Sequence, residues 1–359
     1  MMKVTLVFNG RGISGLSSYS SNLRRVLSKN TKIEEVDVSK NIPKIASIMA
    51  WLVPFDIKAL FSNHPLFLPK IKSDLVHFTS QNLAIPLLFR TYKNVVTVHD
   101  LALFEFNSKE LFAGKSCSFL KKIFLKLNLI ALKNANSIIV DSEFTKKRLV
   151  EMVRYPEYKI HVVYLGVDRR IYKPSRLVKS EKYPCTILYV GSEMPRKNLS
   201  VLFMAFARLK ERLPQAKLVK IGQQQWPGSR ERLIRLASDL DILNSVEFVD
   251  DTDDLATYYR RATLLVHPSI YEGFGFTVLE AMACGCPVIC SDKTSLPEVA
   301  GKSAVYFDGY DTDDLAKKMY KVLTDKKLQD NMRKKGLKRA DKFSWQKTVE
   351  KTIEVYRES

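Results

Sequence analysis

The sequence predicts an α/β protein made of two doubly wound, parallel-sheet domains, and three observations lead to this prediction. The chain has 359 residues, which is long for one domain, and 46% of them are hydrophobic, which is enough for large cores. Short apolar runs rich in β-branched residues alternate with helical patterns along the whole chain. About five of these runs fall in each half, so two similar sheets are favoured over one very wide sheet.

Each strand is expected where an apolar run is short and is followed by a helical pattern. The first run holds five residues, fewer than the roughly 7–15 residues of a secretory signal core, so a strand is expected there instead. The expected strands are 4–8, 75–78, 95–98, 137–140 and 162–164 in the first half, and 186–190, 217–221, 246–249, 264–266 and 288–290 in the second.

A segment of linker composition separates the two halves. It contains Pro174, Pro184 and a run of charged residues, which is typical of a connection between domains. We therefore expect an N-terminal Rossmann-like domain at 1–165, a linker at 166–184, a C-terminal Rossmann-like domain at 185–342 and a final helical segment at 343–359.

Charge and composition limit which classes of binding partner and which cellular compartment are expected. The formal net charge is +20, and residues 1–170 hold 26 Lys and Arg against 13 Asp and Glu, so an anionic partner is expected, mainly for the first domain. The basic stretches lack interleaved aromatic residues and no recognition module is visible, which disfavours nucleic acid. Five cysteines without a CxxC pair favour a reducing cytoplasm. The longest apolar stretches without charge hold 11 residues, whereas a spanning helix needs about 20, so no transmembrane segment is expected.

An apolar helix with lysines is expected at Phe119–Asn134. It carries Lys121, Lys122, Lys126 and Lys133. Two interpretations stay open: a helix that lies on an anionic membrane surface, and a helix packed in the core with its lysines solvated.

The turn after the first expected strand has the pattern G-x-G-x-x-G from Gly10 to Gly15. Glycines there let backbone N–H groups approach an anion at a helix N-terminus. The acidic residues Glu34, Glu35 and Asp37 follow at the end of a probable second strand, as they would in an enzyme that uses a nicotinamide cofactor. A turn without a special role is the alternative.

The most informative stretch runs from His267 to Ala283 and contains two glutamates eight residues apart. Glu272 follows a strand in a turn that Gly273 and Gly275 make permissive, and Glu280 lies within the next helix. This helix begins near Phe276, so the N–H groups from Gly275 to Thr277 would face the crevice at the strand ends and could bind an anion.

Two further groups are expected at the carboxyl ends of strands. Arg196 and Lys197 follow the first strand of the second half, where a guanidinium fork and an ammonium suit a diphosphate. His99 directly follows the strand at 95–98 in the first half, so it is expected at the edge of the first sheet.

These residues resemble the large retaining glycosyltransferase family 4. The paired glutamates in EGFGFTVLEAMACGCPVI match its E-x7-E signature, PRKN matches its phosphate-binding loop, and His-Asp after a first-domain strand matches its histidine. The resemblance covers nearly the whole chain and implies the GT-B architecture, in which two Rossmann-like domains face each other across a cleft. In this family the final helix, here near Phe343-Ser-Trp345, crosses back to the first domain.

The resemblance also implies roles for single residues, in a cleft that binds a nucleotide diphosphate sugar mainly through the second domain. Catalytic roles are implied for His99 beside the donor sugar, for Arg196 and Lys197 on the diphosphate, and for Glu272 on sugar hydroxyls. The residues with an implied donor-binding role are Gly15 on the distal phosphate, Val249 beside the base with its neighbour Phe248, Phe274, Gly275, Phe276 and Thr277 at the helix start, and Glu280 on the ribose.

Two positions depart from the family pattern, and one motif is discounted. Ser192 stands where many members have Arg, so Arg196 is expected to act alone, and Asp250 stands where a Gly often follows the base-side strand. Asp251-Thr-Asp253 is a D-x-D, but it precedes a helix that begins near Leu255 and is interpreted as part of the acidic start of that helix. No metal is expected, because Arg196, Lys197 and the helix N-terminus can stabilise the leaving diphosphate.

The expected protein is therefore a metal-independent retaining hexosyltransferase with no cofactor. The resemblance of HDLALFEF and PRKN to mannosyltransferase-type members favours mannose, with GDP or UDP as the nucleotide. The acceptor would be a glycan or a lipid-linked glycan, and the enzyme would be cytoplasmic and peripheral on an anionic membrane surface. Two alternatives stay open: an NAD(P)-dependent oxidoreductase that uses the turn from Gly10 to Gly15, and a non-catalytic glycan-binding protein with the same fold.

Overall fold

The protein is represented by a computed structural model that describes residues 2–10, 15–29, 31–40, 63–66, 68–105, 119–175, 185–225 and 228–359. Within these ranges the chain forms two compact units. Unit 1 contains the described residues up to Glu105, those from 119 to Gly166, and Trp345–Ser359. Unit 2 contains the described part of Val167–Ser344.

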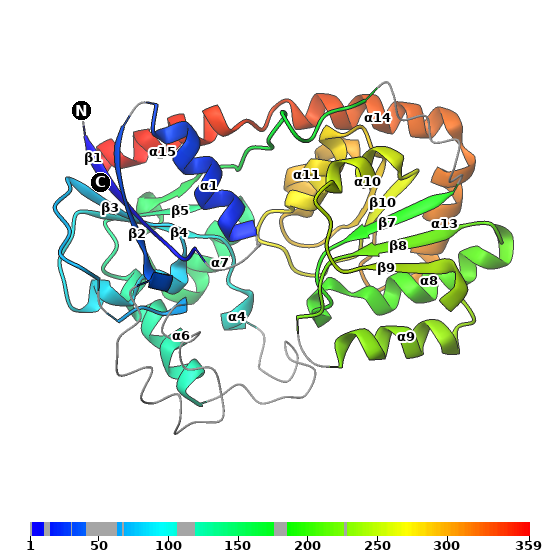
Figure 1. Ribbon diagram of the computed structural model, residues 1–359, viewed down its shortest axis with the longest axis horizontal. Coiled ribbons are helices and arrows are strands. Elements are labelled where there is room, and N and C mark those ends of the chain that lie inside the picture. The colour runs from blue at the N-terminus through cyan, green and yellow to red at the C-terminus, as the bar shows by residue number, and fades with distance from the viewer. Residues whose placement is uncertain are drawn as a thin grey trace. The chain divides into compact units, whose positions relative to one another are not determined.

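Unit 1 is built on a parallel six-stranded sheet with the order β2-β1-β3-β4-β5-β6 (Figure 1). Its three central strands are apolar and almost fully buried, as expected for a parallel sheet with helices on both faces. The elements are β1 (Lys3–Phe8), α1 (Gly15–Leu27), β2 (Lys32–Asp37), β3 (Leu75–Phe78), β4 (Asn94–Val98), α4 (Ala102–Glu105), α6 (Phe119–Leu132), β5 (Ser137–Val140), α7 (Glu143–Val153), β6 (Ile160–Val162) and α15 (Trp345–Glu358).

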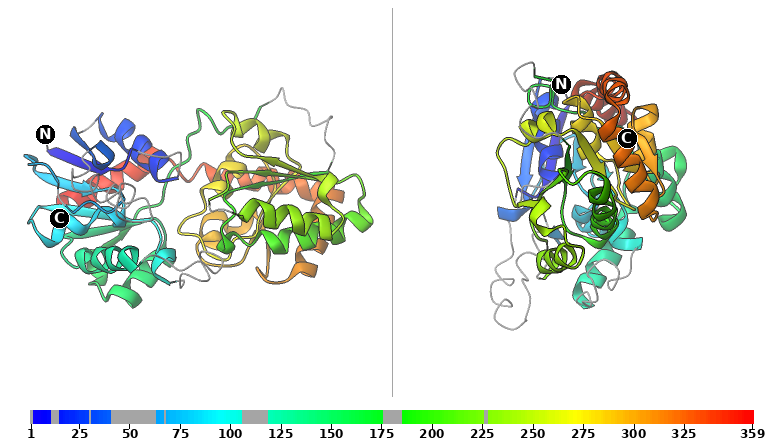
Figure 2. Two further views of the ribbon diagram at one scale, coloured as in Figure 1. Left: turned by 60° about the horizontal axis from the view of Figure 1, so that its bottom comes forward. Right: turned by 90° about the vertical axis from the view of Figure 1, so that its right-hand side faces the viewer.

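Unit 2 repeats this plan with the order β12-β11-β10-β7-β8-β9. The helices that cover its sheet can be followed in Figure 2. The elements are β7 (Thr186–Val190), α8 (Leu199–Arg212), β8 (Lys217–Ile221), α9 (Ser229–Asp239), β9 (Val246–Val249), α10 (Leu255–Arg261), β10 (Leu264–His267), α11 (Phe276–Ala283), β11 (Val288–Ser291), α12 (Leu296–Ala300), β12 (Val305–Phe307), α13 (Thr312–Thr324) and α14 (Lys326–Ala340).

The prediction of two parallel α/β sheets is confirmed, and the differences lie in single strands. Each sheet has six strands instead of about five. The strand expected at 162–164 lies at Ile160–Val162, and β12 was not expected. Beyond it, Val163 and Leu165 are buried on either side of the exposed Tyr164, and this alternation is why the apolar pattern looks like a strand.

Strand order locates the point in each unit where a ligand is best held. In unit 1 the chain goes from β1 to β2 on one side and to β3 on the other, so the order reverses between β1 and β3. In unit 2 it reverses between β7 and β10. In open α/β sheets ligands bind at the carboxyl ends of the strands at such a reversal.

Candidate functional site

The loop after β7 brings two cations to the reversal point of unit 2. A short 3-10 turn, Pro195–Lys197, presents Arg196 and Lys197, and it ends at Asn198, which has a left-handed backbone (φ 58°). The amide of Asn198 donates to the carbonyls of Pro268 (3.2 Å) and Gly309 (2.6 Å). These two hydrogen bonds connect the loop after β7 to the loops that follow β10 and β12.

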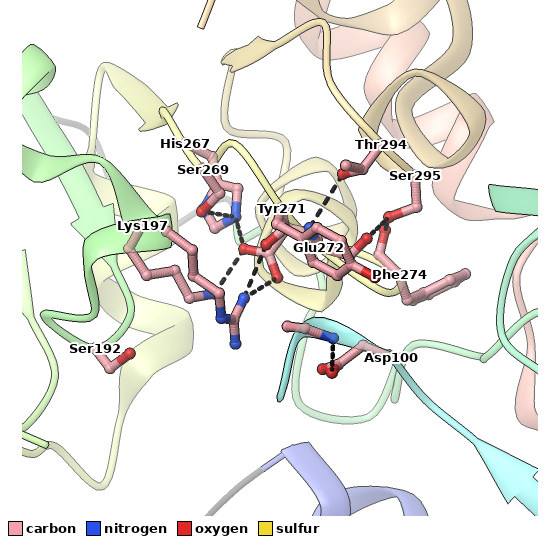
Figure 3. A network of polar contacts seen from close by, with 12 residues as sticks. Asp100, Ser192, Lys197, His267, Ser269, Tyr271, Glu272, Phe274, Thr294 and Ser295 are labelled. Carbon is pink, nitrogen blue, oxygen red and sulfur yellow. Dashed lines mark hydrogen bonds and ion pairs between the residues drawn. The ribbon is translucent and has the colours of Figure 1, made fainter. Parts of the chain in front are cut away.

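Glu272 lies between these cations. Its Oε1 is 2.6 Å from Lys197 Nζ and 2.8 Å from His267 Nε2, and its Oε2 is 3.5 Å from Arg196 Nη1 (Figure 3). Arg196 also donates to the carbonyl of Tyr271 at 2.8 Å. Burial alone would raise the pKa of Glu272, but Lys197, His267 and Arg196 outweigh it and hold that pKa well below its ordinary value. The predicted residues Arg196, Lys197 and Glu272 thus form one cluster with net positive charge.

The backbone around Glu272 is fixed from the loop that precedes α12. The Glu272 N–H donates to the Thr294 hydroxyl at 3.0 Å, and the Ser295 hydroxyl is 2.9 Å from the carbonyl oxygens of both Glu272 and Phe274. These bonds hold the turn that leads into α11 (Figure 3).

Gly275 caps the N-terminus of α11 with φ 112°, a conformation that glycine adopts without strain. A Cβ there would also lie 3.0 Å from Leu296 Cδ2. The predicted residues Phe276 and Thr277 are half-buried in the first turn of α11, where helix N–H groups favour an anion. Phe274 is 4% exposed, and its ring packs edge-to-face against Phe276 and Phe343, so its side chain is covered by protein.

Glu280 lies further along α11 and accepts a hydrogen bond from the Tyr259 hydroxyl at 2.9 Å. The Tyr172 hydroxyl is a second hydrogen-bond partner, and the two tyrosine rings pack edge-to-face with centroids 6.0 Å apart. Burial raises the pKa of Glu280 to about 7, and the two hydroxyls oppose this rise. The sequence predicted Glu280 but not its two tyrosines, because they come from α10 and from the segment that precedes β7.

A second charged network at the carboxyl ends of β7 and β8 was not predicted. Lys220 and Glu193 are both fully buried and 2.7 Å apart, and Arg230 Nε lies 2.5 Å from the same Glu193 oxygen. Arg230 also pairs with Asp250 at 2.8 Å and lies over the ring of Phe248 at 4.8 Å. A lysine in the middle of an apolar strand was the available signal, since lysine is almost never buried unless it is paired.

This network includes Asp250 and Phe248, two residues that were singled out near the base-side strand. Asp250, where the family often has Gly, is exposed but holds Arg230. Val249 ends β9 and is half-buried, and its carbonyl accepts the Gly222 N–H at 2.8 Å. The carbonyl of Ser192 accepts the Tyr189 hydroxyl at 2.8 Å.

In unit 1 both ring nitrogens of His99 are engaged. Nδ1 is 2.6 Å from Asp141, which directly follows β5, and Nε2 is 2.9 Å from the carbonyl oxygen of Thr79. Because a carbonyl can only accept, Nε2 carries a proton. Burial would lower the pKa of His99, but Asp141 and the Thr79 carbonyl outweigh it and raise that pKa. Asp141 was not predicted, although an acid directly after an apolar strand is the same signal that marked His99.

A buried hydrogen-bonded chain lies beside His99. The Tyr19 ring packs edge-to-face on His99 with centroids 4.7 Å apart, and its hydroxyl is 3.0 Å from Thr97. Thr97 is 2.7 Å from His77 Nε2, and His77 Nδ1 is 2.6 Å from the Tyr356 hydroxyl of α15. The C-terminal helix therefore contributes to the polar core of unit 1.

The glycine turn lies only partly within the described residues. Gly10 is described and Gly15 is the first residue of α1, whereas residues 11–14, including Gly12, lie outside the described ranges. The Gly10 N–H donates to Asp37 at 2.9 Å, and Glu34 and Glu35 pair with Lys3 and Arg24. All three acids that would suit a nicotinamide enzyme are therefore engaged within unit 1.

The lysine-bearing helix is α6, and the face it exposes is mixed. Lys122, Lys126 and Lys133 are exposed, and so are Ile123 (36%) and Ile130 (51%); the side chain of Lys121 lies outside the described residues. At the end of α6, Asn134 donates to the carbonyl of Leu87, two residues before Phe89, whose side chain is 59% exposed. We call the exposed residues Phe89, Lys122, Ile123, Lys126, Ile130 and Lys133 the α6 surface.

Within the described residues, the candidate metal ligands, the start of α10 and the hydropathy of the helices bear on the expectations about metal and membrane. No group of three His, Cys, Asp or Glu side chains is arranged to hold a metal ion. In the D-x-D region it is Asp254 that caps α10, by accepting the Thr257 N–H at 3.1 Å, while Asp251 accepts from Thr252. None of the described helices combines the length and hydropathy needed to cross a bilayer.

Comparison with sequence families gives two matches that together span most of the chain. The profile described as Glycosyltransferase Family 4 matches residues 15–170, and the profile described as Glycosyl transferases group 1 matches residues 168–339.

Two curated relatives are mannosyltransferases by name. The chain is 28% identical over 387 residues to the O-antigen chain mannosyltransferase B of Escherichia coli, covering 96% of each protein. It is 30% identical over 292 residues to the serotype-specific mannosyltransferase WbdA of Escherichia coli, covering 78% of this chain but about a third (35%) of WbdA.

Solved structures show the same fold at low sequence identity. A sucrose-phosphate synthase from Thermosynechococcus elongatus superposes with a TM-score of 0.78 at 20% identity, covering 100% of this chain and 99% of the other. Anabaena Alr3699/HepE in complex with UDP and glucose superposes with a TM-score of 0.77 at 17% identity, covering 100% of both chains. The predicted GT-B fold is therefore confirmed.

Proposed function

Because the chain belongs to glycosyltransferase family 4 and is a glycosyltransferase, we propose that it moves a hexose, specifically mannose, from a nucleotide diphosphate sugar to a glycan or lipid-linked acceptor. The donor would be held by unit 2, with its diphosphate near Arg196 and Lys197 and at the N-terminus of α11. Glu272 would contact sugar hydroxyls, and Glu280 would accept hydrogen bonds from the ribose. The names of the two E. coli relatives support mannose.

The observation that carries this proposal is the cluster of Arg196, Lys197 and Glu272 at the reversal point of the second sheet. Breaking the bond between the anomeric carbon and the diphosphate adds negative charge to the leaving group and leaves an oxocarbenium-like sugar. Two fixed cations and the helix N–H groups of α11 would stabilise that leaving group without reorganising. A metal ion is then not required for this charge, and the reaction would be metal-independent.

The proposed reaction retains the anomeric configuration of the sugar, as the family resemblance implies. A front-face mechanism suits the cluster, because Lys197 and His267 both bind Glu272, which is therefore occupied rather than placed as a free nucleophile. The leaving phosphate would then help to deprotonate the acceptor hydroxyl.

His99, at the carboxyl end of β4, would contact the donor sugar near the reacting carbon, as the family resemblance implies. Since both of its ring nitrogens are bound by Asp141 and Thr79, we expect it to contact the sugar through its ring edge or its main chain. Gly15, at the start of α1, would present its N–H to the distal phosphate.

The anionic partner of unit 1 would be a membrane that carries the lipid-linked acceptor. The α6 surface supports this, since lysines beside exposed Ile and Phe side chains suit a headgroup region in which charge and apolar side chains are both accommodated. We propose a cytoplasmic protein that is peripheral on the inner face of that membrane.

A nucleotide panel tests the proposal. Thermal unfolding is measured with UDP, GDP, ADP, CMP and dTDP, and a bound ligand stabilises by RT ln(1 + [L]/Kd), about 2.7 kcal/mol at 100 times Kd. We expect GDP to raise the Tm most, and GDP-mannose to release GDP slowly without acceptor and faster with it. If no nucleoside diphosphate raises the Tm, the donor site is wrong. Binding without release of GDP would support the non-catalytic glycan-binding alternative.

The oxidoreductase alternative is not supported by the site. It leaves Arg196, Lys197 and Glu272 without a role, and its candidate acids are engaged by Lys3, Arg24 and Gly10. A titration of NADH fluorescence checks this, and we expect no saturable change.

A further inference from the structure

His267 ends β10 and takes part in the Glu272 cluster, although no role was predicted for it. Its side chain is 1% exposed. Nε2 lies 2.8 Å from Glu272 Oε1 and 3.2 Å from the Ser269 hydroxyl, whereas Nδ1 has no hydrogen-bond partner among the described residues (Figure 3). The ring stacks on Tyr189, with the two planes 12° apart.

This geometry fixes where the proton of the ring lies. An ionised carboxylate only accepts hydrogen bonds, so the nitrogen that faces Glu272 carries the proton. A second proton on Nδ1 would be a buried N–H without a partner and would add a third positive charge beside Lys197 and Arg196. His267 is therefore a neutral Nε2–H donor, and burial correspondingly lowers its pKa.

A neutral donor does something that the cations of the cluster cannot do. Lys197 Nζ binds the same oxygen of Glu272 at 2.6 Å, but a diphosphate placed nearby competes for the lysine. The diphosphate has no such attraction for an uncharged imidazole. The His267 bond therefore persists when the lysine turns toward phosphate oxygens.

We propose that His267 is a positioning residue that keeps the Glu272 carboxylate aimed at the donor sugar while Arg196 and Lys197 are engaged by the diphosphate. This inference rests on the proposed function, because it assigns His267 a task in the same donor site. It predicts that His267 affects the sugar-dependent step and hardly affects the binding of a nucleoside diphosphate without sugar.

Two substitutions separate hydrogen bonding from packing. His267→Phe keeps a flat ring on Tyr189 but has no N–H, whereas His267→Gln offers an amide N–H to Glu272. We expect kcat with GDP-mannose to fall about 10–100-fold in the Phe variant, the range for a lost hydrogen bond to a charged group, and to return to within a few-fold of wild type in the Gln variant. The Kd for GDP should change less than a few-fold in both. His161→Phe, which replaces a half-buried histidine of β6 in unit 1, is the control.

The outcomes separate this inference from the proposed function. Three outcomes would each overturn the positioning role: equal losses of kcat in the Phe and Gln variants, an unchanged kcat in the Phe variant, or loss of GDP binding together with turnover. Thermal unfolding checks that both variants fold. Nitrogen-15 NMR of the imidazole tests the bond without substrate, and we expect a neutral Nε2–H ring whose Nε2 resonance shifts in Glu272→Gln. A cationic or Nδ1–H ring overturns the inference even if wild type turns over GDP-mannose. A wild-type protein that binds no nucleotide and turns over no sugar overturns the proposed function, and this inference with it, whatever the NMR shows.

Discussion

Lys197 is the residue whose charge the proposed chemistry needs most directly. It lies 2.6 Å from Glu272 Oε1 and is mostly buried, so little water screens its interaction with an added anion. The diphosphate carries more negative charge in the transition state than in the bound donor. A cation placed here therefore favours the transition state over the ground state.

We expect Lys197→Ala to lower kcat with GDP-mannose by about 10²–10³-fold, the usual cost of removing one preorganised transition-state partner. Initial rates of GDP release measure this. Lys335→Ala, which removes an exposed lysine of α14, is the matched control and should keep its rate. Near-normal turnover in Lys197→Ala would show that the diphosphate does not bind at this cluster.

Glu280 makes the stability of unit 2 depend on pH. Its pKa rises from 4.5 to about 7 on folding, because burial disfavours the charged carboxylate. The folded state thus binds the proton more tightly than the unfolded state. Glu280 does not oppose folding at pH values well below 4.5; its destabilising effect grows as the pH rises from 4.5 to about 7 and is constant at higher pH.

We expect the free energy of unfolding of wild type, relative to Glu280→Gln, to fall by at most roughly 3 kcal/mol between pH 4.5 and pH 8, since one pKa unit corresponds to 1.36 kcal/mol. Urea denaturation of both proteins at several pH values measures the difference. Taking the difference cancels the other buried groups, including His77, whose pKa is lowered to about 3. A difference that does not change with pH would show that Glu280 keeps an ordinary pKa in the folded protein, and a difference that rises with pH would show that its pKa is lowered.

At the scale of elements, α15 belongs to unit 1 although it follows the whole of unit 2 along the chain. Two contacts explain this. Thr348 donates to the carbonyl of Tyr164 at 2.9 Å, and the Tyr356 hydroxyl lies 2.6 Å from His77 on the central strand β3. His77 and Tyr356 are both fully buried, so each needs the other as a polar partner.

Removing that hydroxyl should therefore destabilise unit 1. We expect Tyr356→Phe to cost about 1–3 kcal/mol, because the buried Nδ1 of His77 loses its partner. Thermal or urea unfolding measures the loss. Combining it with His77→Phe should cost less than the sum of the two single substitutions, since the double variant leaves neither group unpaired. Full additivity would indicate that the two side chains are not coupled.

The strands that lie inside a sheet were all located well by their sequence patterns. β3, β4, β5, β7 and β10 were predicted to within a residue at each end, because a strand covered by helices is a continuous apolar run. The strand that was missed, β12, and the strand that was displaced, β6, are edge strands, although the edge strand β9 lies where it was predicted, at Val246–Val249. Edge strands are paired on one side only and are partly exposed, so their apolar signal is short. β2, also an edge strand, has four charged residues among its six positions: Lys32, Glu34, Glu35 and Asp37.

For the candidate site, the positions of single residues at strand ends could be predicted, but their pairings could not. His99, Arg196, Lys197 and Glu272 were predictable because each follows a strand closely, and strand ends share one edge of a sheet. Pairings between distant segments were not predictable: Asp141 with His99, Tyr172 and Tyr259 with Glu280, and Glu193 with Lys220. Such pairs depend on the three-dimensional neighbours of a residue, about which the local pattern carries no information.

At the scale of the whole molecule, the formal net charge of +20 is unevenly distributed, with an excess of 13 positive charges in residues 1–170. Net charge alone would attract the protein to any anionic surface. The α6 surface makes a more specific prediction, because its lysines flank exposed Ile123 and Ile130 on one helix. Contact there would combine attraction to anionic lipid with burial of apolar side chains.

Two triple variants with the same change in net charge separate these cases. One replaces Lys122, Lys126 and Lys133 of the α6 surface by Glu, and the other replaces the exposed Lys334, Lys335 and Lys338 of α14 by Glu. We expect wild type and the α14 variant to sediment with vesicles that contain anionic lipid, and the α6 variant to lose most of this binding, at about 1 kcal/mol per lysine near the surface.

Salt supplies the second part of this experiment. Raising the ionic strength to 1 M shortens the Debye length to about 3 Å, so binding through lysines should weaken steeply, while the contribution of Ile123, Ile130 and Phe89 should persist. Equal losses in the two triple variants would show that only the overall charge matters. If binding does not depend on salt, or if the protein does not bind anionic vesicles at all, the proposed membrane association is wrong. The proposed donor site in unit 2 would be unaffected, because other residues form it.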